Sequence, residues 1–207
     1  MRYGILGGTF DPPHIGHLAL AQEAHARLQL DRVWFTPAAS PPHKYGQPIS
    51  DAADRRAMVE LAIAEDDRFG LETVDLDRPG PSFTVETLRL LRERWGASAW
   101  MGFIVGWDML QSLPDWHDPA GVLAALDAVI ATPRPGFSQP DADDEALASL
   151  ERRLPGVRAR LRLLPAPQLD ISSSDLRERV TQGLPVRYLT PEPVRSYISR
   201  RGLYAPA

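Results

Sequence analysis

The 207-residue chain contains no cysteine and no asparagine, and only one of its 23 basic residues, Lys44, is a lysine. The absence of cysteine excludes disulfide bonds, thiolate catalysis and cysteine-ligated metals. The absence of asparagine and cysteine, which are thermolabile, fits a warm-living source, whereas a GC-rich genome, which favours alanine, arginine, glycine and proline codons, is the alternative. Under both readings the single lysine is a residue to follow.

The sequence also lacks a long apolar run and an excess of positive charge. Its longest apolar stretch, Ala99–Trp107, is far shorter than the roughly 20 residues needed to cross a bilayer. The N-terminus runs directly into a motif and leaves no room for a cleavable signal. The net charge of −4 argues against a nucleic-acid binder. We therefore expect a cytoplasmic protein with no membrane or nucleic-acid partner, which holds any anion in a local basic site.

Short apolar runs alternate with longer helical patterns along most of the chain. Strands separated by helices indicate right-handed βαβ units, so the expected fold is doubly wound α/β with a parallel sheet. The expected strands are Tyr3–Leu6, Val33–Thr36, Leu71–Val74, Trp100–Val105, Ala128–Ala131 and Leu161–Leu164. The expected helices are Ile15–Leu28, Ala52–Glu65, Val85–Trp95, Ala120–Leu126, Glu145–Leu154, Ser173–Thr181 and Pro191–Arg201.

A chain of this length and hydrophobic content, 43%, is enough for one well-buried domain. We expect a sheet core over residues 1–165 and a helical C-terminal part over 166–207, since no strand pattern follows Leu164. In the last helix, Thr190 is the expected cap, Pro191 the first helical residue and Gly202 the end. Two loop-like segments, 37–50 and 133–144, are rich in proline, glycine or aspartate.

The first strand ends in the motif Gly-Gly-Thr-Phe-Asp-Pro-Pro-His-Ile-Gly-His at residues 7–17. The consecutive prolines place the helix start at about Pro13, which puts His14 in the first turn and His17 one turn later on the same face. Free backbone N–H groups, the positive end of the helix dipole and two imidazoles then converge on an anion site. Gly16 would leave room for a phosphate between the histidines. Metal binding and a purely structural role for the histidines are the alternatives, although no third metal ligand is evident.

A second helix start of similar type lies at Ile-Ser-Ser-Ser-Asp-Leu-Arg, residues 171–177. Consecutive serines before an apolar-periodic stretch form an N-cap with spare hydroxyls, and Arg177 lies one turn in. Alone, this pattern is explained by ordinary capping. With the histidine motif, it suggests two helix N-termini that face one polyphosphate. His25 differs, because it falls on the apolar face of its helix and is expected to be packed or half-buried.

The two motifs resemble the nucleotidyltransferase superfamily of the HxGH type. More narrowly, the chain resembles the bacterial nicotinate-nucleotide adenylyltransferases over nearly its whole length. The narrower resemblance depends on Pro41-Pro42-His43-Lys44, the run from Pro81 to Leu88, Gly106-Trp107-Asp108, Trp116, Arg134-Pro135-Gly136, and the ending from Thr190 to Tyr204. A Rossmann-like nucleotidyltransferase fold is what this resemblance implies.

For ATP, the resemblance implies a site that begins at the end of the first strand and continues at the end of the fourth. His14, His17 and Arg177 would be the catalytic groups and would act on the phosphates. The implied ATP-binding residues are Gly8, Thr9, Phe10, His14, His17, Gly106, Asp108, Ser172, Ser173 and Arg177.

For the acceptor, the resemblance implies nicotinate mononucleotide. Lys44 and Arg134 would meet acceptor phosphate or polyphosphate, and Trp116 would stack on the pyridine ring. Backbone amides near Thr84 and His117 would bind the ring carboxylate. An in-line attack of the acceptor phosphate on the α-phosphorus of ATP would expel pyrophosphate, and this needs positioning and charge stabilisation rather than a side-chain nucleophile. The implied cofactor is Mg²⁺ held mainly by ATP phosphates, without a metal site made by the protein.

Two residues depart from the pattern of the nicotinate-nucleotide adenylyltransferases. Phe83 stands where the family commonly has tyrosine. Trp107 is larger than expected and is either a stacking surface or lid, or a side chain packed beneath the sheet edge.

A pantetheine-phosphate adenylyltransferase would share both motifs but lack the Pro-Pro-His-Lys loop and the Trp116 region. A non-catalytic nucleotide sensor would not need His14, His17 and Arg177 intact.

Overall fold

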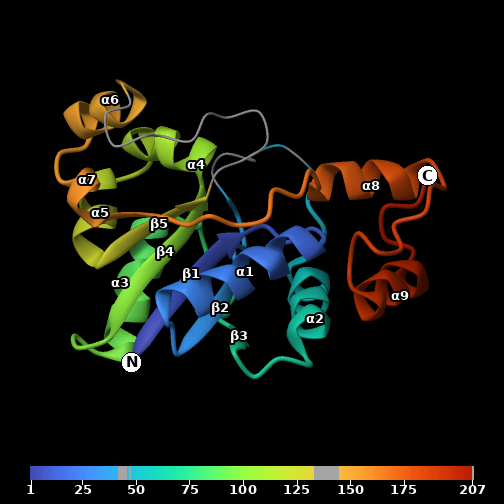
Figure 1. The fold of residues 1–207 in the computed structure, drawn as a ribbon. Coiled ribbons are helices and arrows are strands. Elements are labelled where there is room, and N and C mark those ends of the chain that lie inside the picture. The colour runs from blue at the N-terminus through green and yellow to red at the C-terminus, as the bar shows by residue number, and fades with distance from the viewer. Residues whose placement is uncertain (42–45, 47, 133–144, 207) are drawn as a thin grey trace.

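The computed structural model describes residues 1–41, 46, 48–132 and 145–206. All strands of its six-stranded sheet are parallel, in the order β3-β2-β1-β4-β5-β6 (Figure 1). This confirms the doubly wound α/β fold class. The strands are β1 (Arg2–Gly8), β2 (Arg32–Pro37), β3 (Phe69–Leu71), β4 (Trp100–Gly106), β5 (Ala128–Thr132) and β6 (Leu161–Leu163).

The expected helices are all present, with ends that differ by at most two residues. The longer helices are α1 (Ile15–Leu28), α2 (Ala52–Ile63), α3 (Thr84–Trp95), α5 (Pro119–Ala125), α6 (Glu145–Arg153), α8 (Ser173–Thr181) and α9 (Glu192–Arg201). Three short helical segments escaped prediction because they span too few residues to show a helical period: α4 (Trp107–Ser112), η2 (Leu113–Asp115) and α7 (Val157–Arg160). Within the described residues, no helix has the length and apolar character to cross a bilayer.

The third strand is the one whose predicted position was wrong. It covers Phe69–Leu71 instead of Leu71–Val74. The chain leaves the sheet at Glu72, whose buried carboxylate accepts a hydrogen bond from the backbone N–H of Val74 (3.1 Å). This local bond closes a turn, so the apolar Val74 packs into the core from a loop and not from a strand.

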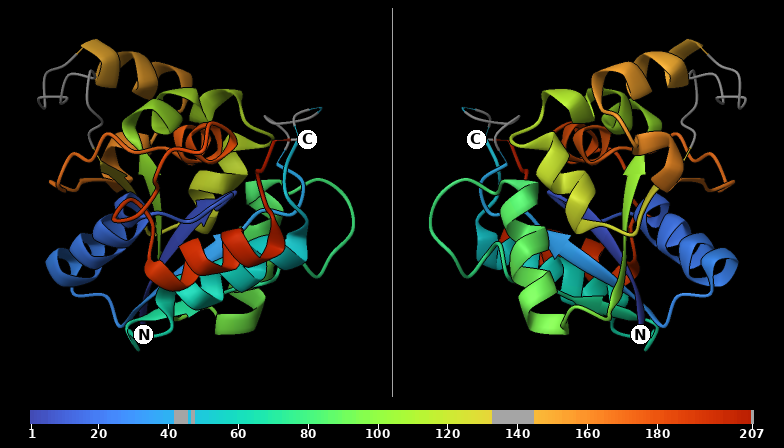
Figure 2. Two further views of the ribbon diagram at one scale, coloured as in Figure 1. Left: turned by 90° about the vertical axis from the view of Figure 1, so that its right-hand side faces the viewer. Right: turned by 90° about the vertical axis from the view of Figure 1, so that its left-hand side faces the viewer.

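Helices cover both faces of the sheet, and Figure 2 shows α1 and α3 on opposite sides of it. Successive strand residues point to opposite faces, so Ile5 packs with Leu88 and Leu91 of α3. Its neighbour Leu6 packs on the other face, in the cluster that contains Ala21 of α1. The two apolar clusters therefore fix which helices lie on each side.

The chain reverses its direction across the sheet between β1 and β4. These strands are adjacent, with Leu6 beside Ile104 in the register, yet β2 lies on one side of the pair and β5 on the other. Loops that leave the carboxyl ends of two such strands diverge and open a crevice, the usual ligand position in open α/β sheets. The histidine motif leaves β1 at this point and the Gly106–Asp108 segment leaves β4.

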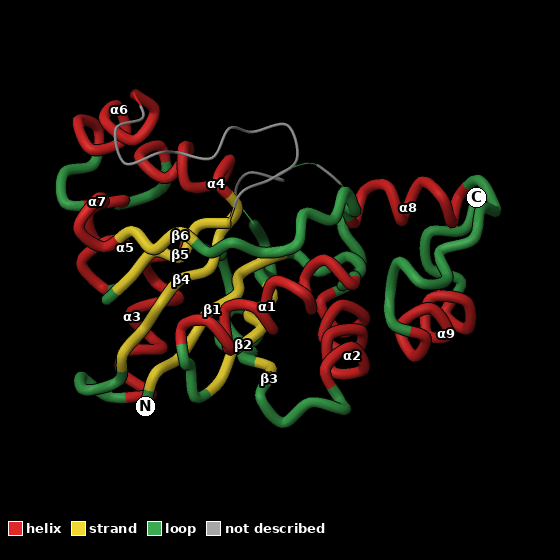
Figure 3. The backbone as a smooth tube through the Cα atoms, viewed as in Figure 1, coloured by secondary structure: helices red, strands yellow, loops and turns green. Residues whose placement is uncertain are grey.

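After β6 the chain crosses the molecule to α8 and α9, which lie together at one end (Figures 1 and 3). Helix α9 packs on α2 through the buried side chains of Met58, Val194 and Ile198. It ends at Gly202 in the left-handed conformation (φ 62°), as expected. The expected cap was wrong, because Pro191 occupies the N-cap position and the hydroxyl of Thr190 is used elsewhere.

Candidate active site

The loop after β1 is shaped by the ring of Phe10. Phe10 has a positive φ of 52° and is 1% exposed. Its ring centroid lies 4.9 Å from that of His17 and 5.5 Å from that of Phe35. A Cβ on Gly8 would lie 3.0 Å from the same ring, which explains the need for glycine. Phe10 thus turns into the core and supports the imidazole of His17.

The two histidines are coupled at the start of α1. The helix begins at Ile15, not at Pro13, and His14 is its extended N-cap. The backbone N–H of His14 donates to Nδ1 of His17 (3.2 Å), and the ring centroids lie 3.7 Å apart. Because Nδ1 accepts, the proton of a neutral His17 is assigned to Nε2. His17 can therefore present an Nε2–H donor to an anion.

Two of the amides expected to be free at this helix start are engaged, and an imidazole lies beside Gly16 where room for a phosphate was expected. A Cβ at Gly16 would lie 3.0 Å from Nδ1 of His14, so this glycine accommodates the imidazole itself. The N–H of Ile15 donates to the carbonyl of Leu189 (3.1 Å), and that of His17 donates to the carbonyl of His14 (3.0 Å). The amides of Ile15 and His17 are therefore committed to bonds within the protein, while the imidazoles and the helix dipole still favour an anion here.

The second motif lies directly against the first, as expected. Three consecutive carbonyls, those of residues 11–13, accept hydrogen bonds from Arg177 Nη1 (2.8 Å), Ser173 Oγ (2.8 Å) and Thr190 Oγ1 (2.7 Å). Two prolines in this segment have no N–H, so their backbones can only accept. Ser172 acts as an ordinary N-cap, since its Oγ accepts from the N–H of Asp175 (3.0 Å). The C-terminal part thus holds the segment that presents both histidines.

A buried carboxylate, Asp11, ties this segment to two other parts of the chain. It is 2% exposed and accepts from the hydroxyl of Tyr204 (2.6 Å) and from the N–H of Ser50 (3.2 Å). Burial, with the hydrogen bond to Asp11 and its negative charge, raises the pKa of Tyr204 well above its ordinary value. The sequence reasoning did not assign Asp11 a role, because a partner 193 residues away leaves no local signal.

At the carboxyl end of β4, Gly106 is the N-cap of α4 and Trp107 is its first residue. Trp107 is 3% exposed and packs in the same core cluster as Leu110 and Leu113. The packing alternative is therefore confirmed for Trp107, and a stacking or lid role is excluded in this conformation. Asp108 lies in the first turn of α4 and is partly exposed.

The residues expected to bind the pyridine ring lie near one another. The rings of Phe83 and His117 are stacked with centroids 4.2 Å apart, which brings Thr84, the first residue of α3, close to His117. Trp116 is half-buried, and its Nε1–H donates to Ser112 Oγ (3.1 Å). The other two acceptor-binding residues of the prediction, Lys44 and Arg134, lie outside the described residues.

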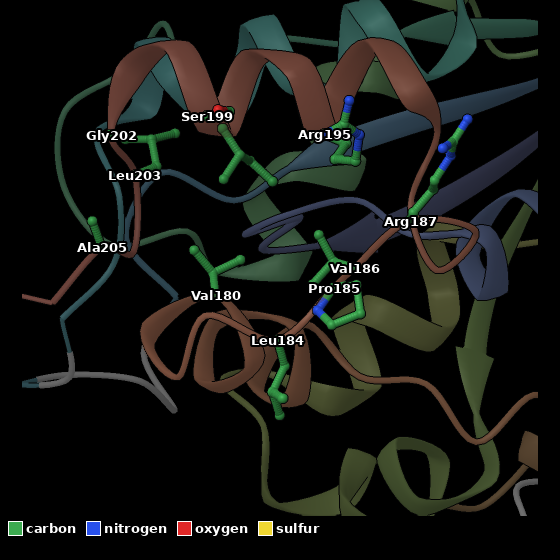
Figure 4. Close-up of a pocket in the computed structure, with 11 residues that line it drawn as sticks. Val180, Leu184, Pro185, Val186, Arg187, Arg195, Ser199, Gly202, Leu203 and Ala205 are labelled. Atoms are coloured by element: carbon green, nitrogen blue, oxygen red, sulfur yellow. The ribbon is translucent and has the colours of Figure 1, made fainter.

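Two further observations bear on what this chain could bind. In the described part of the chain, no group of three or more His, Asp or Glu side chains is placed to hold a metal ion. A pocket of about 500 Å³ lies between α8 and α9, lined mostly by apolar side chains such as Leu184, Val186 and Leu203 (Figure 4). None of the residues expected to bind substrate lines it, and its Arg195 is paired with Glu192 (2.5 Å).

Comparisons with known proteins agree on one family. Residues 5–179 match the family model described as cytidylyltransferase-like. The chain is 43% identical over 205 residues to a probable nicotinate-nucleotide adenylyltransferase of Thermomicrobium roseum, with 98% of this chain and 91% of the relative covered. It is 44% identical to another from a Roseiflexus species, over 97% of this chain and 96% of the relative.

Solved structures show the same fold at low sequence identity. A Plasmodium falciparum nicotinic acid mononucleotide adenylyltransferase complexed with APC superposes with a TM-score of 0.76 at 18% identity, over 98% of this chain and 96% of that one. A putative nicotinate-nucleotide adenylyltransferase from Vibrio parahaemolyticus gives a TM-score of 0.64 at 15% identity, over 100% of this chain and 96% of that one.

Proposed function

The chain belongs to the nicotinate-nucleotide adenylyltransferase family, and from that premise we propose that it transfers an adenylyl group from ATP to nicotinate mononucleotide. The products are nicotinate adenine dinucleotide and pyrophosphate, a step in NAD biosynthesis. One nucleotidyltransferase domain over residues 1–207, in the cytoplasm, would carry this reaction.

The observation that carries this proposal is the direct contact between the histidine motif at residues 7–17 and the serine motif at residues 171–177. Arg177 and Ser173 donate to carbonyls of residues 11–13, immediately before His14. Two helix N-termini, one imidazole pair and one guanidinium are thereby gathered at the carboxyl end of β1. Such a concentration of donors and positive charge suits a triphosphate, whose charge shifts towards the leaving pyrophosphate during transfer.

The proposed reaction is an in-line displacement at the α-phosphorus of ATP that uses no side-chain nucleophile. The acceptor phosphate oxygen attacks the α-phosphorus, and the bond between the α- and β-phosphates breaks as pyrophosphate leaves. His14, His17 and Arg177 are proposed to stabilise charge on the transferring and leaving groups. For His17, whose Nδ1 accepts from the backbone, the Nε2–H is the ring donor proposed to meet a phosphate oxygen. Gly8, Thr9, Phe10, Gly106, Asp108, Ser172 and Ser173 complete the proposed ATP site.

The acceptor would lie between the start of α3 and the segment that follows η2. Trp116 has its indole N–H engaged by Ser112, which fixes the ring orientation for stacking on a pyridine. Backbone amides near Thr84 and His117 are proposed to bind the carboxylate, and the Phe83–His117 stack holds these two segments together. Lys44 and Arg134 are proposed to meet acceptor phosphate or polyphosphate.

The family reaction uses a divalent cation with ATP, and we propose Mg²⁺ as that ion. Mg²⁺ prefers to keep several waters and to bind substrate phosphates, so it needs no dedicated protein cage. No group of three or more His, Asp or Glu side chains lies together in the described residues, which is consistent with an ion held mainly by the ATP phosphates. When bound, it would neutralise charge between those phosphates, while the protein residues orient them.

The test is pyrophosphate release with ATP, Mg²⁺ and a panel of acceptors. Nicotinate mononucleotide, nicotinamide mononucleotide and 4′-phosphopantetheine are each supplied alone, with identification of the dinucleotide formed. Rapid turnover with nicotinate mononucleotide is expected. Turnover only with phosphopantetheine would show that the chain is a pantetheine-phosphate adenylyltransferase. ATP binding without turnover on any acceptor would favour a non-catalytic nucleotide sensor.

A further inference from the structure

Arg55, in the first turn of α2, is the feature that the proposed mechanism leaves without a role. It is 1% exposed, and its guanidinium donates only to backbone carbonyls among the bonds identified. Burial lowers its pKa, although the charge of Asp11 opposes this shift. Its acceptors are the carbonyls of Ser50 (3.0 Å), Thr9 (3.0 Å), Ala38 (2.6 Å) and Ala39 (3.1 Å).

A buried guanidinium without a hydrogen-bonded carboxylate is expensive to desolvate, so its retention calls for a reason beyond packing. The reason lies in what it joins. Thr9 follows β1 and belongs to the proposed ATP site, whereas Ala38 and Ala39 follow β2. The planar fork of arginine offers five N–H donors in fixed directions, which lets one side chain hold both segments at once.

A second pair of hydrogen bonds extends this connection towards the acceptor. The N–H of Ser40 donates to Oγ of Ser82 (3.1 Å), and the N–H of Ser82 donates to the carbonyl of Ser40 (3.0 Å). Ser82 lies two residues before Thr84, whose backbone is proposed to bind the pyridine carboxylate. A continuous path of bonds therefore runs from Thr9 through Arg55 and residues 38–40 to the segment before Thr84.

We propose that Arg55 is a positioning residue that sets the separation between the ATP loop at Thr9 and the acceptor-binding segment at residues 82–84. This inference rests on the proposed function. Arg55 itself holds the backbones of Thr9, Ala38 and Ala39, and it reaches residues 82–84 only through the bonds between Ser40 and Ser82. In-line attack depends on the placement of one substrate relative to the other, and a misplacement of about 1 Å can cost about 100-fold in rate. The proposed role of Arg55 is thus to align ATP with the acceptor mononucleotide when both are bound to the enzyme.

The test compares Arg55→Lys and Arg55→Met with the control Arg56→Met. Arg56 is the next residue on α2, is exposed, and pairs only with Glu60 (2.9 Å) among the contacts identified. Lysine keeps the charge but has three donors on one atom and cannot span the two segments. We expect kcat to fall by about 100-fold in Arg55→Lys. The Kd of each substrate alone, measured by calorimetry, should change by less than about threefold because each half-site stays intact.

A double-mutant cycle with Ser82→Ala separates alignment from general destabilisation. Removal of the Ser82 hydroxyl takes away the acceptor for the N–H of Ser40, the next link in the path. If both residues act through that path, the second substitution adds little to the loss in kcat caused by the first. Independent structural effects would instead multiply, within about twofold.

Several outcomes overturn the proposal. Wild-type kcat in Arg55→Lys, or losses that multiply with those of Ser82→Ala, would show that Arg55 does not align the substrates. If Arg55→Met fails to fold, Arg55→Lys carries the test, and failure of both variants to fold would assign Arg55 to stability alone. Failure of the proposed function is seen separately, as absence of turnover with nicotinate mononucleotide in the wild type and in Arg56→Met. The variants are then compared on the acceptor that the wild type does use.

Discussion

Tyr204→Phe tests the connection between the C-terminus and the histidine segment. The substitution removes one hydroxyl, which donates to the buried carboxylate of Asp11 over 2.6 Å. The ring keeps its place against the cluster formed by α2 and α9, so no cavity is created. A hydrogen bond to a charged group contributes about 1.5–3 kcal/mol, and for a chain of this size each kcal/mol shifts Tm by about 2–4 °C. We therefore expect a fall in Tm of about 3–12 °C at pH 7.

The assay is thermal unfolding followed by circular dichroism, with Tyr188→Phe as the matched control. Tyr188 is 78% exposed, so its hydroxyl is hydrated in both the folded and unfolded states. The control should melt within about 1 °C of the wild type, as is usual for surface substitutions. A Tyr204→Phe variant that melts with the control would refute the argument that this hydroxyl satisfies a buried charge.

The same bond predicts a pH dependence of definite sign. The folded state keeps the Tyr204 proton because the pKa of this group is raised, whereas the unfolded chain loses it near pH 10. The stabilisation is therefore complete below about pH 10 and decreases as pH rises above that value. The stability gap between wild type and Tyr204→Phe, from urea denaturation, should shrink between pH 8 and about pH 11. A constant gap would contradict the assigned pKa shift.

Three further predictions concern catalysis. His17→Ala should lower kcat by about 10²–10³ while the protein still folds, and a loss under about fivefold would remove His17 from the catalytic set. Lys44→Ala should raise the KM of a substrate with little change in Tm, whereas a surface role predicts that neither changes. The acid mononucleotide should be preferred over the amide by about one to three decades in kcat/KM, because the backbone donors proposed near Thr84 and His117 would suit a carboxylate and leave the amide NH₂ unpaired. Comparable kcat/KM values in direct competition would mean that the pocket accepts both.

Patterns over a few neighbouring residues of the sequence determined the fold class and most of the helix positions of this protein. The alternation of strand and helix signals predicted the parallel α/β sheet, and the serines before Leu176 predicted the start of α8. These features depend on the period of apolar residues and on capping chemistry, both of which act over a few residues. The two motifs also predicted that they would lie together, since each was expected to supply a helix N-terminus for the same polyphosphate.

Only the tertiary structure decided how those motifs are held. Arg177, Ser173 and Thr190 bind the carbonyls of residues 11–13, and Tyr204 reaches Asp11, across more than 160 residues of chain. The same packing places the imidazole of His14 over Gly16, where a phosphate was expected. A hydrogen bond to a backbone carbonyl carries no sequence signature at the acceptor, because every residue has that group. Which carbonyls Arg55 and Arg177 bind is therefore set by the folded chain and cannot be deduced from the order of its residues.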